Sequence, residues 1–407
     1  MKKVIVSFTS YPKRIAGVTK VLDSLSVQTY KPDRIILYLS EEQFGGRKIP
    51  IDLSPYAAHG FELRWCRGDM KSHKKYLYAL QEYPDDYVIT VDDDFYYDSC
   101  MVEEFVRNTQ CFPGAVLARR SHLMTSYREG DIAAYEKWWG ECLHYVGTPR
   151  MDLFAVGCGG VLYPPHIFDS EVFHEEYIRK YCPYADDVWL KVMELLRGVP
   201  VVQVKTRYWD VADLKYAQNG LCQNVNGNGG NDRQLKNLLE LYGQKHGGTG
   251  SLIERVFSDG VTYVDEVEQG KMEDERRSLE EWIEEIAQFQ NIFIYGAGRV
   301  AGRIYQVLKR HIQAERFRAF LVEDVSQNVD QIEGIPVLPY ITAQYQDAVC
   351  VVGLASQEEQ LKVSKKLLET GMEKGQIVCI NVRIQEAVYR TIHSERMQDG
   401  SEGGGAK

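Results

Sequence analysis

The sequence predicts an α/β protein with two domains, and three observations support this prediction. Apolar strands alternate with amphipathic helices in both halves of the chain, which is typical of parallel sheets with right-handed crossovers. The length of 407 residues is more than one ordinary hydrophobic core accommodates. The hydrophobic fraction of 44% is that of a well-packed globular protein, so the chain can fill two cores.

The first alternating pattern predicts a domain over residues 1–247. Its strands are expected at Val4–Phe8, Arg34–Leu39, Phe61–Trp65, Tyr87–Val91 and Val199–Val204. Its helices are expected at Val18–Leu25, Met70–Tyr83 and Tyr184–Leu196. Asparagine and glycine dominate between Asn219 and Asp232, which predicts a mobile loop there.

The second pattern predicts a smaller, doubly wound domain over residues 291–385. Its strands are expected at Asn291–Tyr295, Ala319–Val322 and Ala348–Val352. An acidic connector, with one helix near Ser278–Phe289, is expected over residues 248–290. Residues 386–407 end in SEGGGAK and are expected to form a flexible tail.

The composition excludes several classes of function. The net charge of −10 argues against a nucleic-acid partner, which needs a basic surface. No apolar run approaches the roughly 18 residues that span a bilayer. The opening MKKVIVSFTS is short and interrupted by polar residues, so it is interpreted as a strand and not as a secretory signal. Nine cysteines without CxxC spacing favour a reducing cytoplasm.

Three adjacent carboxylates, Asp92, Asp93 and Asp94, follow the apolar strand that begins at Tyr87. Open α/β sheets bind ligands at the carboxyl ends of their strands. Crowded carboxylates repel one another, so the triplet is costly unless a divalent cation with diphosphate oxygens compensates it. A solvated turn is the alternative, but a turn needs only one or two aspartates. We therefore interpret the triplet as a metal and phosphate site.

Four polar residues follow the first strand at the same expected edge of the sheet: Thr9, Ser10, Tyr11 and Arg14. The guanidinium of Arg14 is close enough in sequence to reach a phosphate bound there. A strand-to-helix turn containing Pro12 explains these residues equally well.

A lysine pair precedes the fourth strand. If residues 70–83 are helical, Lys71 and Lys75 lie together on one face, where an anion would relieve their repulsion. The N-terminus of this helix would also favour phosphate. A solvated lysine face explains the pair equally well. His73 falls on the apolar face and is expected in the core.

A glycine-rich run, Gly157-Cys-Gly-Gly, leads into the apolar residues Val161-Leu-Tyr. Gly159 and Gly160 allow another group to approach the backbone closely, which suits the wall of a sugar pocket. A plain tight turn is an equally good interpretation.

Two carboxylates, Asp186 and Asp187, begin a predicted amphipathic helix. Asp186 is a suitable N-cap, and this structural role accounts for one of them. A helix N-terminus lowers the pKa of a nearby carboxyl group, so we expect Asp187 to stay ionised and to accept a proton.

These residues together resemble a known family. The stretches VSFTSYPKRI, SLSVQTYKPDRIILYLS and ITVDDDF are similar to the GT-A fold of nucleotide-sugar-dependent glycosyltransferases. Bacterial enzymes that build surface polysaccharides are the most similar, within the large inverting family typified by cellulose synthase. The resemblance covers roughly the first 245 residues.

The resemblance implies roles for the candidate residues. Asp92 would face the ribose and, with Asp94, a Mn²⁺ or Mg²⁺ ion. Asp187 would be the catalytic base, with Asp186 as its support or as an acceptor contact. The other donor-binding residues would be Thr9, Ser10, Tyr11, Arg14, Lys71, Lys75, Asp93, Gly159 and Gly160, with Tyr11 stacked on the base and a lysine on the diphosphate.

The C-terminal domain contains its own motif, because Gly296, Gly298 and Ala301 fit G-x-G-x-x-A between a strand and a helix. Glu323, after the next strand, is placed to accept a hydrogen bond from a ribose hydroxyl. This unit resembles the small nucleotide-binding-like domain of sugar acetyltransferases. The motif leaves open whether this domain binds NAD(P) or another nucleotide. An assembly or regulatory role is the favoured interpretation of the domain.

The sequence therefore predicts a cytoplasmic glycosyltransferase that moves a sugar, with UDP as the expected nucleotide, to a carbohydrate hydroxyl. A lipid-linked glycan at the inner membrane face is an expected acceptor. Whether the protein forms a homo-oligomer through its C-terminal domain is left open. The alternatives are an NAD(P)-dependent oxidoreductase and a non-catalytic sugar-binding scaffold. A nucleotidyltransferase is disfavoured because no glycine- and lysine-rich loop lies near the start.

Overall fold

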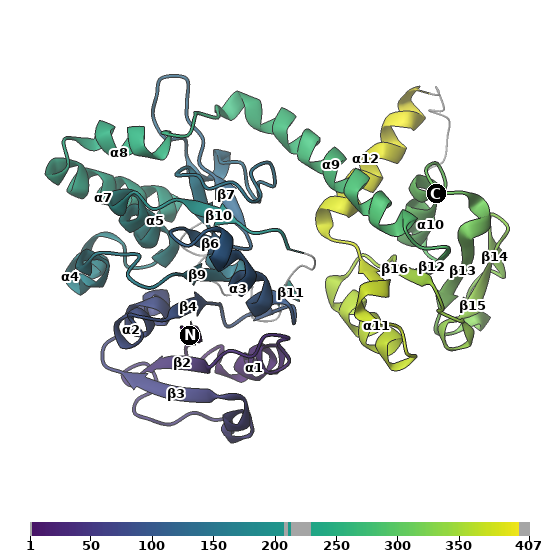
Figure 1. Cartoon of the computed structure of the whole chain (residues 1–407), viewed down its shortest axis with the longest axis horizontal. Coiled ribbons are helices and arrows are strands. Elements are labelled where there is room, and N and C mark those ends of the chain that lie inside the picture. Colours follow the sequence, from purple (N-terminus) through teal and green to yellow (C-terminus); the bar gives the residue numbers. More distant parts are fainter. Residues whose placement is uncertain (1, 207–210, 213–228, 399–407) are drawn as a thin grey trace. The chain divides into compact units, whose positions relative to one another are not determined.

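The computed structural model describes residues 2–206, 211–212 and 229–398 and divides into two compact units (Figure 1). These units are Met1–Gly270 and Lys271–Lys407, and the division falls inside helix α9 (Val267–Ala287). Each unit has its own sheet and its own hydrophobic core. The predicted α/β class with mainly parallel sheets is confirmed, whereas the predicted limits at residues 247, 290 and 385 stay predictions.

The sheet of the first unit has the strand order β10-β6-β9-β4-β1-β2-β3. Four strands run parallel, as the alternating pattern predicts: β1 (Val4–Thr9), β2 (Arg34–Ser40), β3 (Phe61–Cys66) and β4 (Tyr87–Thr90). Three strands follow later in the chain: β6 (Val116–Ala118), β9 (Val161–Tyr163) and β10 (Val201–Gln203). Strand β9 lies antiparallel between β4 and β6, which the sequence pattern does not predict.

Helices cover both faces of this sheet. They are α1 (Val18–Ser26), α2 (Lys74–Glu82), α3 (Met101–Cys111), α4 (Glu175–Tyr181), α5 (Asp186–Arg197), α7 (Asn231–Lys245) and α8 (Thr249–Val256). Successive strand residues point to opposite faces, so Val6 packs with α1 and α3 while Ile5 packs with α2, α5 and α7. Both side chains are fully buried, which fits the uninterrupted apolar run of a strand covered on two sides.

The connectivity of the first unit creates one functional edge. In the parallel register, Val6 of β1 lies opposite Ile35 of β2 and Ile89 of β4. The carboxyl ends of β1 to β4 therefore lie along the same edge of the sheet. The loops that follow these strands carry most of the candidate residues.

The second unit is built around the sheet β14-β15-β13-β12-β16-β17. Its strands are β12 (Asn291–Tyr295), β13 (Phe317–Val322), β14 (Gln331–Ile332), β15 (Ile335–Pro339), β16 (Ala348–Val352) and β17 (Ile377–Cys379). Its own helices are α10 (Arg299–Leu308), α11 (Gln357–Glu369) and α12 (Val382–Gln398). The order spreads in both directions from β12, as expected of a doubly wound sheet. Helices α9, α10 and α12 pack on one face and α11 packs on the other.

Two helices extend beyond their predicted limits. The helix predicted near Ser278–Phe289 begins earlier, at Val267, because its glutamate, lysine and arginine residues favour a helix without a continuous apolar face. The predicted tail from residue 386 is helical up to Gln398, because Ala387 and Val388 are buried in the core of the second unit.

The helix predicted from Met70 begins four residues later. A short 3₁₀ turn, Lys71–His73, precedes α2, and Lys71 has a φ of +51°. Of the predicted mobile loop Asn219–Asp232, residues 219–228 lie outside the described residues, and α7 begins at Asn231. Among the helices that the structure describes, none combines the length and hydrophobicity needed to cross a membrane.

Candidate functional site

The acidic triplet follows β4 at the functional edge, as expected. The peptide N–H of Asp92 donates a hydrogen bond to the phenol oxygen of Tyr97 over 2.7 Å. The same phenol donates to the carbonyl oxygen of Cys158 over 3.1 Å. Tyr97 is fully buried, so its hydroxyl group ties the acidic loop to the glycine-rich loop of residues 157–160.

Lys75 connects the two groups of predicted carboxylates. Its ammonium Nζ lies 2.6 Å from Oδ1 of Asp92 and 2.9 Å from Oδ2 of Asp186. The side chain is only 4% exposed. Burial alone would lower the pKa of Lys75, but the Asp186 and Asp92 carboxylates outweigh it and raise the pKa well above its ordinary value. Lys75 therefore stays charged and holds β4 and α5 together at the site.

The start of α2 is fixed around Lys75. The hydroxyl of Ser7, in β1, donates to the carbonyl oxygen of Lys75 over 2.5 Å. His73 is buried in the core as expected, and its ring bonds the Tyr76 hydroxyl (3.0 Å) and the Cys182 carbonyl (2.8 Å). Burial lowers the pKa of His73 to about 4, so the ring is neutral at pH 7. These bonds connect β1, α2 and the segment that precedes α5.

The aspartate pair at α5 differs from its prediction in two ways. The N-cap is Ala185 and not Asp186, because the Asp186 side chain turns to the ammonium of Lys75. Asp187 was expected to have a lowered pKa, but the pKa is raised to about 8 by burial and then by the charge of Asp186. Burial also opposes ionisation of Asp186, yet Lys75 prevails and lowers its pKa.

The loop after β1 engages the other two members of the triplet. Arg14 lies 2.8 Å from Oδ1 of Asp93 and 3.1 Å from Oδ2 of Asp94. The Ser10 hydroxyl donates to Asp93 over 2.5 Å. Arg14 thus contacts carboxylates here, and its predicted phosphate contact stays a prediction. Tyr11 lies beside it, with the guanidinium carbon 5.9 Å from the ring centre.

Thr9, the last residue of β1, forms a hydrogen bond within the sheet. The hydroxyl of Thr9 donates to the carbonyl oxygen of Tyr38 in β2 over 2.7 Å. Thr9 therefore links two strands at the functional edge, and a role in donor binding stays a prediction for it.

The glycine-rich loop packs directly against the carboxylate group. The N–H of Gly157 donates to Oδ2 of Asp187 over 3.1 Å, and a Cβ atom on Gly157 would lie 2.8 Å from Oδ1 of the same side chain. A Cβ atom on Gly159 would lie 2.7 Å from the Cβ of Arg120. Gly160 has a φ of +85°, which favours glycine. The loop therefore needs glycine to hold Asp187.

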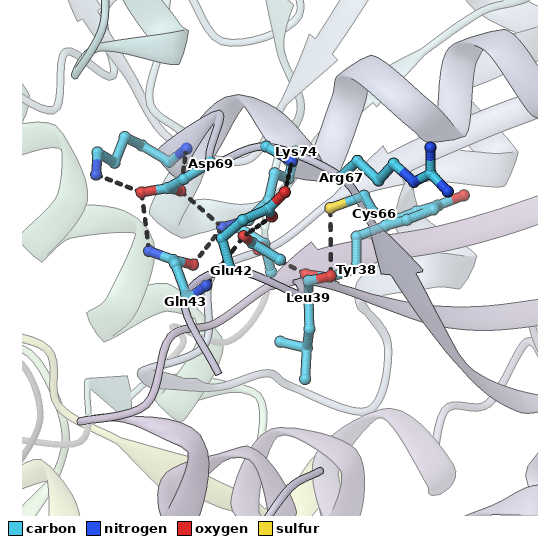
Figure 2. A network of polar contacts seen from close by, with 12 residues as sticks. Tyr38, Leu39, Glu42, Gln43, Cys66, Arg67, Asp69 and Lys74 are labelled. Carbon is cyan, nitrogen blue, oxygen red and sulfur yellow. Dashed lines mark hydrogen bonds and ion pairs between the residues drawn. The ribbon is translucent and has the colours of Figure 1, made fainter. Parts of the chain in front are cut away.

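The predicted lysine pair does not form. Lys71 lies in the 3₁₀ turn and is ion-paired with Asp69, so it does not share a face with Lys75. Figure 2 shows that Asp69 belongs to a polar network with Gln43 and Lys74. The buried Lys74 donates to Gln43 over 2.8 Å and lies 3.3 Å from Asp69. This network joins the loops after β2 and β3 to the first residue of α2.

Two residues of the site are absent from the sequence prediction. Neither Tyr97 nor Arg120 belongs to a recognisable sequence motif. Each contributes to the site through its contact with Cys158 in the glycine-rich loop, and such contacts are visible only in the structure. Arg120 donates to the thiol sulfur of Cys158 over 3.3 Å. A tyrosine five residues after Asp92 is a weak signal, and no sequence signal identifies Arg120.

A divalent metal fits part of this site. Across residues 2–206, 211–212 and 229–398, no three His, Cys, Asp or Glu side chains converge as a metal site. Burial and the adjacent Asp92 carboxylate raise the pKa of Asp94 to about 7, so a cation beside it would relieve electrostatic strain. Two carboxylates suffice when substrate phosphates and water complete the shell of a Mg²⁺ ion.

The glycine motif of the second unit adopts the expected turn. Gly296 has a φ of +106°, and Gly298 is the N-cap of α10, in which Ala301 is buried. Glu323 accepts from Lys366 over 2.6 Å and from the Tyr295 hydroxyl over 3.3 Å. The predicted ribose acceptor therefore has protein partners, and a nucleotide here stays a prediction.

The sequence matches no family model and no curated protein. Solved structures with some likeness include TarS 1–349 of S. aureus in complex with UDP-GlcNAc (13% identity, TM-score 0.33, 68% of this chain and 92% of that chain). Another is the mannosyltransferase PcManGT of Pyrobaculum calidifontis with GDP-Man and Mn²⁺ (12% identity, TM-score 0.29, 51% of this chain and 59% of that chain).

A third such structure is glucosyl-3-phosphoglycerate synthase of Mycobacterium tuberculosis with Mg²⁺ and UDP (15% identity, TM-score 0.30, 50% of this chain and 69% of that chain). One of these three proteins is a mannosyltransferase, and each of the three structures contains a nucleoside diphosphate or a nucleotide-sugar. At such TM-scores they establish neither a family nor an activity for this chain.

Replacing Lys75 by methionine is expected to destabilise the first unit strongly. The change leaves the buried Asp186 carboxylate and the partly exposed Asp92 carboxylate without their shared cation. Removing one partner of a buried ion pair costs about 3–5 kcal/mol, and most of this cost is expected at Asp186. Lys71→Met is the matched control, because its ion pair with Asp69 is partly exposed and worth about 0–1 kcal/mol. Urea denaturation measures both free energies of unfolding, and equal values for the two variants would contradict the bridging role.

Asp187→Asn is expected to make the protein more resistant to alkaline pH. The pKa of Asp187 is about 8 in the folded chain and about 3.9 when unfolded, so the folded state holds the extra proton between these values. Wild-type stability therefore falls as pH rises through this window, and the amide removes that loss. Melting temperatures from about pH 5 to about pH 9, without metal, should diverge in favour of the variant.

The exposed Asp85 provides the control for this experiment. Asp85→Asn should follow the wild type at every pH. A constant difference between Asp187→Asn and the wild type over the whole range would show that Asp187 does not titrate as described.

Proposed function

We propose that the first unit is a metal-dependent glycosyltransferase that moves a sugar from a nucleoside diphosphate, with UDP expected, to a carbohydrate hydroxyl. The observation that carries the proposal is the ammonium of Lys75 between Asp92 and Asp186. It brings the acidic triplet and the aspartate pair into one site. Such a site has carboxylates for a donor's metal on one side and a buried carboxylate for proton transfer on the other.

The donor half would be formed by the loops after β1 and β4. Asp94 and Asp92 would hold Mn²⁺ or Mg²⁺, and the bound ion would stabilise the charge of the departing diphosphate. Arg14 is held beside Asp94 and would turn toward a phosphate once a cation takes its place. Ser10 and Tyr11 lie in the same loop and would line the nucleoside.

The acceptor half would depend on Asp187. Its carboxylate would take the proton from an acceptor hydroxyl while that oxygen bonds to the anomeric carbon. The bond from the anomeric carbon to the diphosphate oxygen breaks in the same step, so the configuration inverts. A pKa of about 8 suits this role, because a base works best when its pKa is near the working pH. Asp186 would support it by retaining Lys75.

The biological setting is a further part of the proposal. It rests on the sequence resemblance to bacterial enzymes of surface polysaccharide synthesis, and it implies a cytoplasmic enzyme. A lipid-linked acceptor would be reached at the inner face of the membrane. The second unit would serve assembly, for example through a homo-oligomer.

A thermal-shift panel of nucleotide-sugars with and without Mn²⁺ tests the proposed function. One donor is expected to raise the melting temperature only when Mn²⁺ is present, because its diphosphate completes the metal shell at Asp94. Asp94→Asn should abolish this stabilisation. Asp85→Asn, at the opposite end of β4, should retain it because Asp85 is exposed and remote from the carboxylate group.

The outcomes separate the rival functions. Absence of any donor effect would contradict the glycosyltransferase, and stabilisation by NADH or NADPH alone would favour an oxidoreductase. Asp187→Asn should retain the donor effect but transfer sugar about 10²–10⁴-fold more slowly. Donor binding with unchanged sugar transfer in this variant would exclude Asp187 as the base.

A further inference from the structure

The second unit contains a cavity of about 420 Å³ between helices α10 and α12. We call it the α10–α12 cavity, and it is lined by Val300, Arg303, Ile304, Ile380, Gln385, Glu386, Val388, Tyr389 and Arg390. Its volume lies in the range of small-molecule sites, about 300–1,000 Å³. The residues of the glycine motif do not line it.

The cavity lies where doubly wound sheets commonly bind ligands. Val300 is in the first turn of α10, which follows β12, and Ile380 follows β17 directly. Both strands belong to the parallel part of the sheet, so these residues lie at its carboxyl edge. Ligands of open α/β sheets bind at this edge.

The lining divides into an apolar part and a polar part. Val300, Ile304, Ile380 and Val388 supply aliphatic surface, and three of them are also members of the buried core. The polar residues come from the exposed sides of α10 and α12. Tyr389 is 44% exposed, so its ring presents aromatic surface to solvent beside the aliphatic lining.

The two arginines of the cavity differ in their partners. Arg390 lies 3.3 Å from Glu275 of α9, so its charge is compensated. Arg303 forms no ion pair with any part of the chain that the structure describes, and its guanidinium carbon lies 5.0 Å from the ring centre of Tyr389. A carboxylate or phosphate could therefore bind Arg303 without displacing a protein partner.

We infer that the α10–α12 cavity binds a small organic anion, with its apolar body on the aliphatic lining and its carboxylate or phosphate at Arg303. Glu386 also lines the cavity, and it would repel such an anion. The two charged residues therefore have opposite expected effects on affinity. This site is separate from the carboxylate site of the first unit and does not depend on the proposed transferase activity.

Fluorescence titration of the full chain with anilinonaphthalene sulfonate, an aromatic anion, tests the inference. Arg303→Gln should weaken the binding about tenfold, and Glu386→Gln should strengthen it. Val300→Trp should abolish it by filling the space, since Val300 is only partly buried. The matched control is Arg310→Gln, because Arg310 is exposed and does not line the cavity.

Uncharged phenylnaphthylamine should bind equally to the wild type and to Arg303→Gln. Displacement of the fluorescent anion by octanoate or by octyl phosphate, with octanol as neutral control, distinguishes a carboxylate ligand from a phosphate ligand. Equal affinity of the anion for the wild type, Arg303→Gln and Val300→Trp would overturn the inference. Displacement by octanol as effective as by both octyl anions would also overturn it, because Arg303 would then recognise no charge.

Discussion

The candidate site depends on one buried ammonium group. Lys75 lies between Asp92 after β4 and Asp186 at the start of α5, and these carboxylates are 94 positions apart in the sequence. A buried lysine would lose its charge without such partners, and the carboxylates would be costly without the lysine. Each element of the site is therefore stable in its position because the others are present.

The balance of charge around this lysine gives the site its chemistry. Lys75 and Arg14 are set among five carboxylates: Asp92, Asp93, Asp94, Asp186 and Asp187. Asp94 and Asp187, whose pKa values are raised to about 7 and about 8, are the carboxyl groups proposed to hold a metal and to accept a proton. A carboxylate without a compensating cation destabilises the folded protein. Proteins commonly keep such groups at functional sites, where a ligand or a reaction uses the charge.

The strands and the acidic residues were predictable from the sequence, whereas the contacts between them were not. Apolar runs and the position of Asp92 after β4 identify the functional edge because a parallel sheet gathers its strand ends. The prediction that Lys71 and Lys75 share a helix face was wrong. Their spacing fits a helix, but it does not reveal the 3₁₀ turn in which Lys71 has a positive φ. The prediction of a lowered pKa for Asp187 was also wrong, because a helix N-terminus is visible in the sequence but burial beside Asp186 is not.

A double-mutant cycle on Asp92 and Asp186 tests the shared cation most directly. The variants Asp92→Asn, Asp186→Asn and their combination are compared by the free energy of unfolding. Because the double variant strips Lys75 of both ion pairs, its loss should exceed the sum of the single losses by about 1 kcal/mol or more. Losses that add within about 0.5 kcal/mol would contradict a single site joined through Lys75.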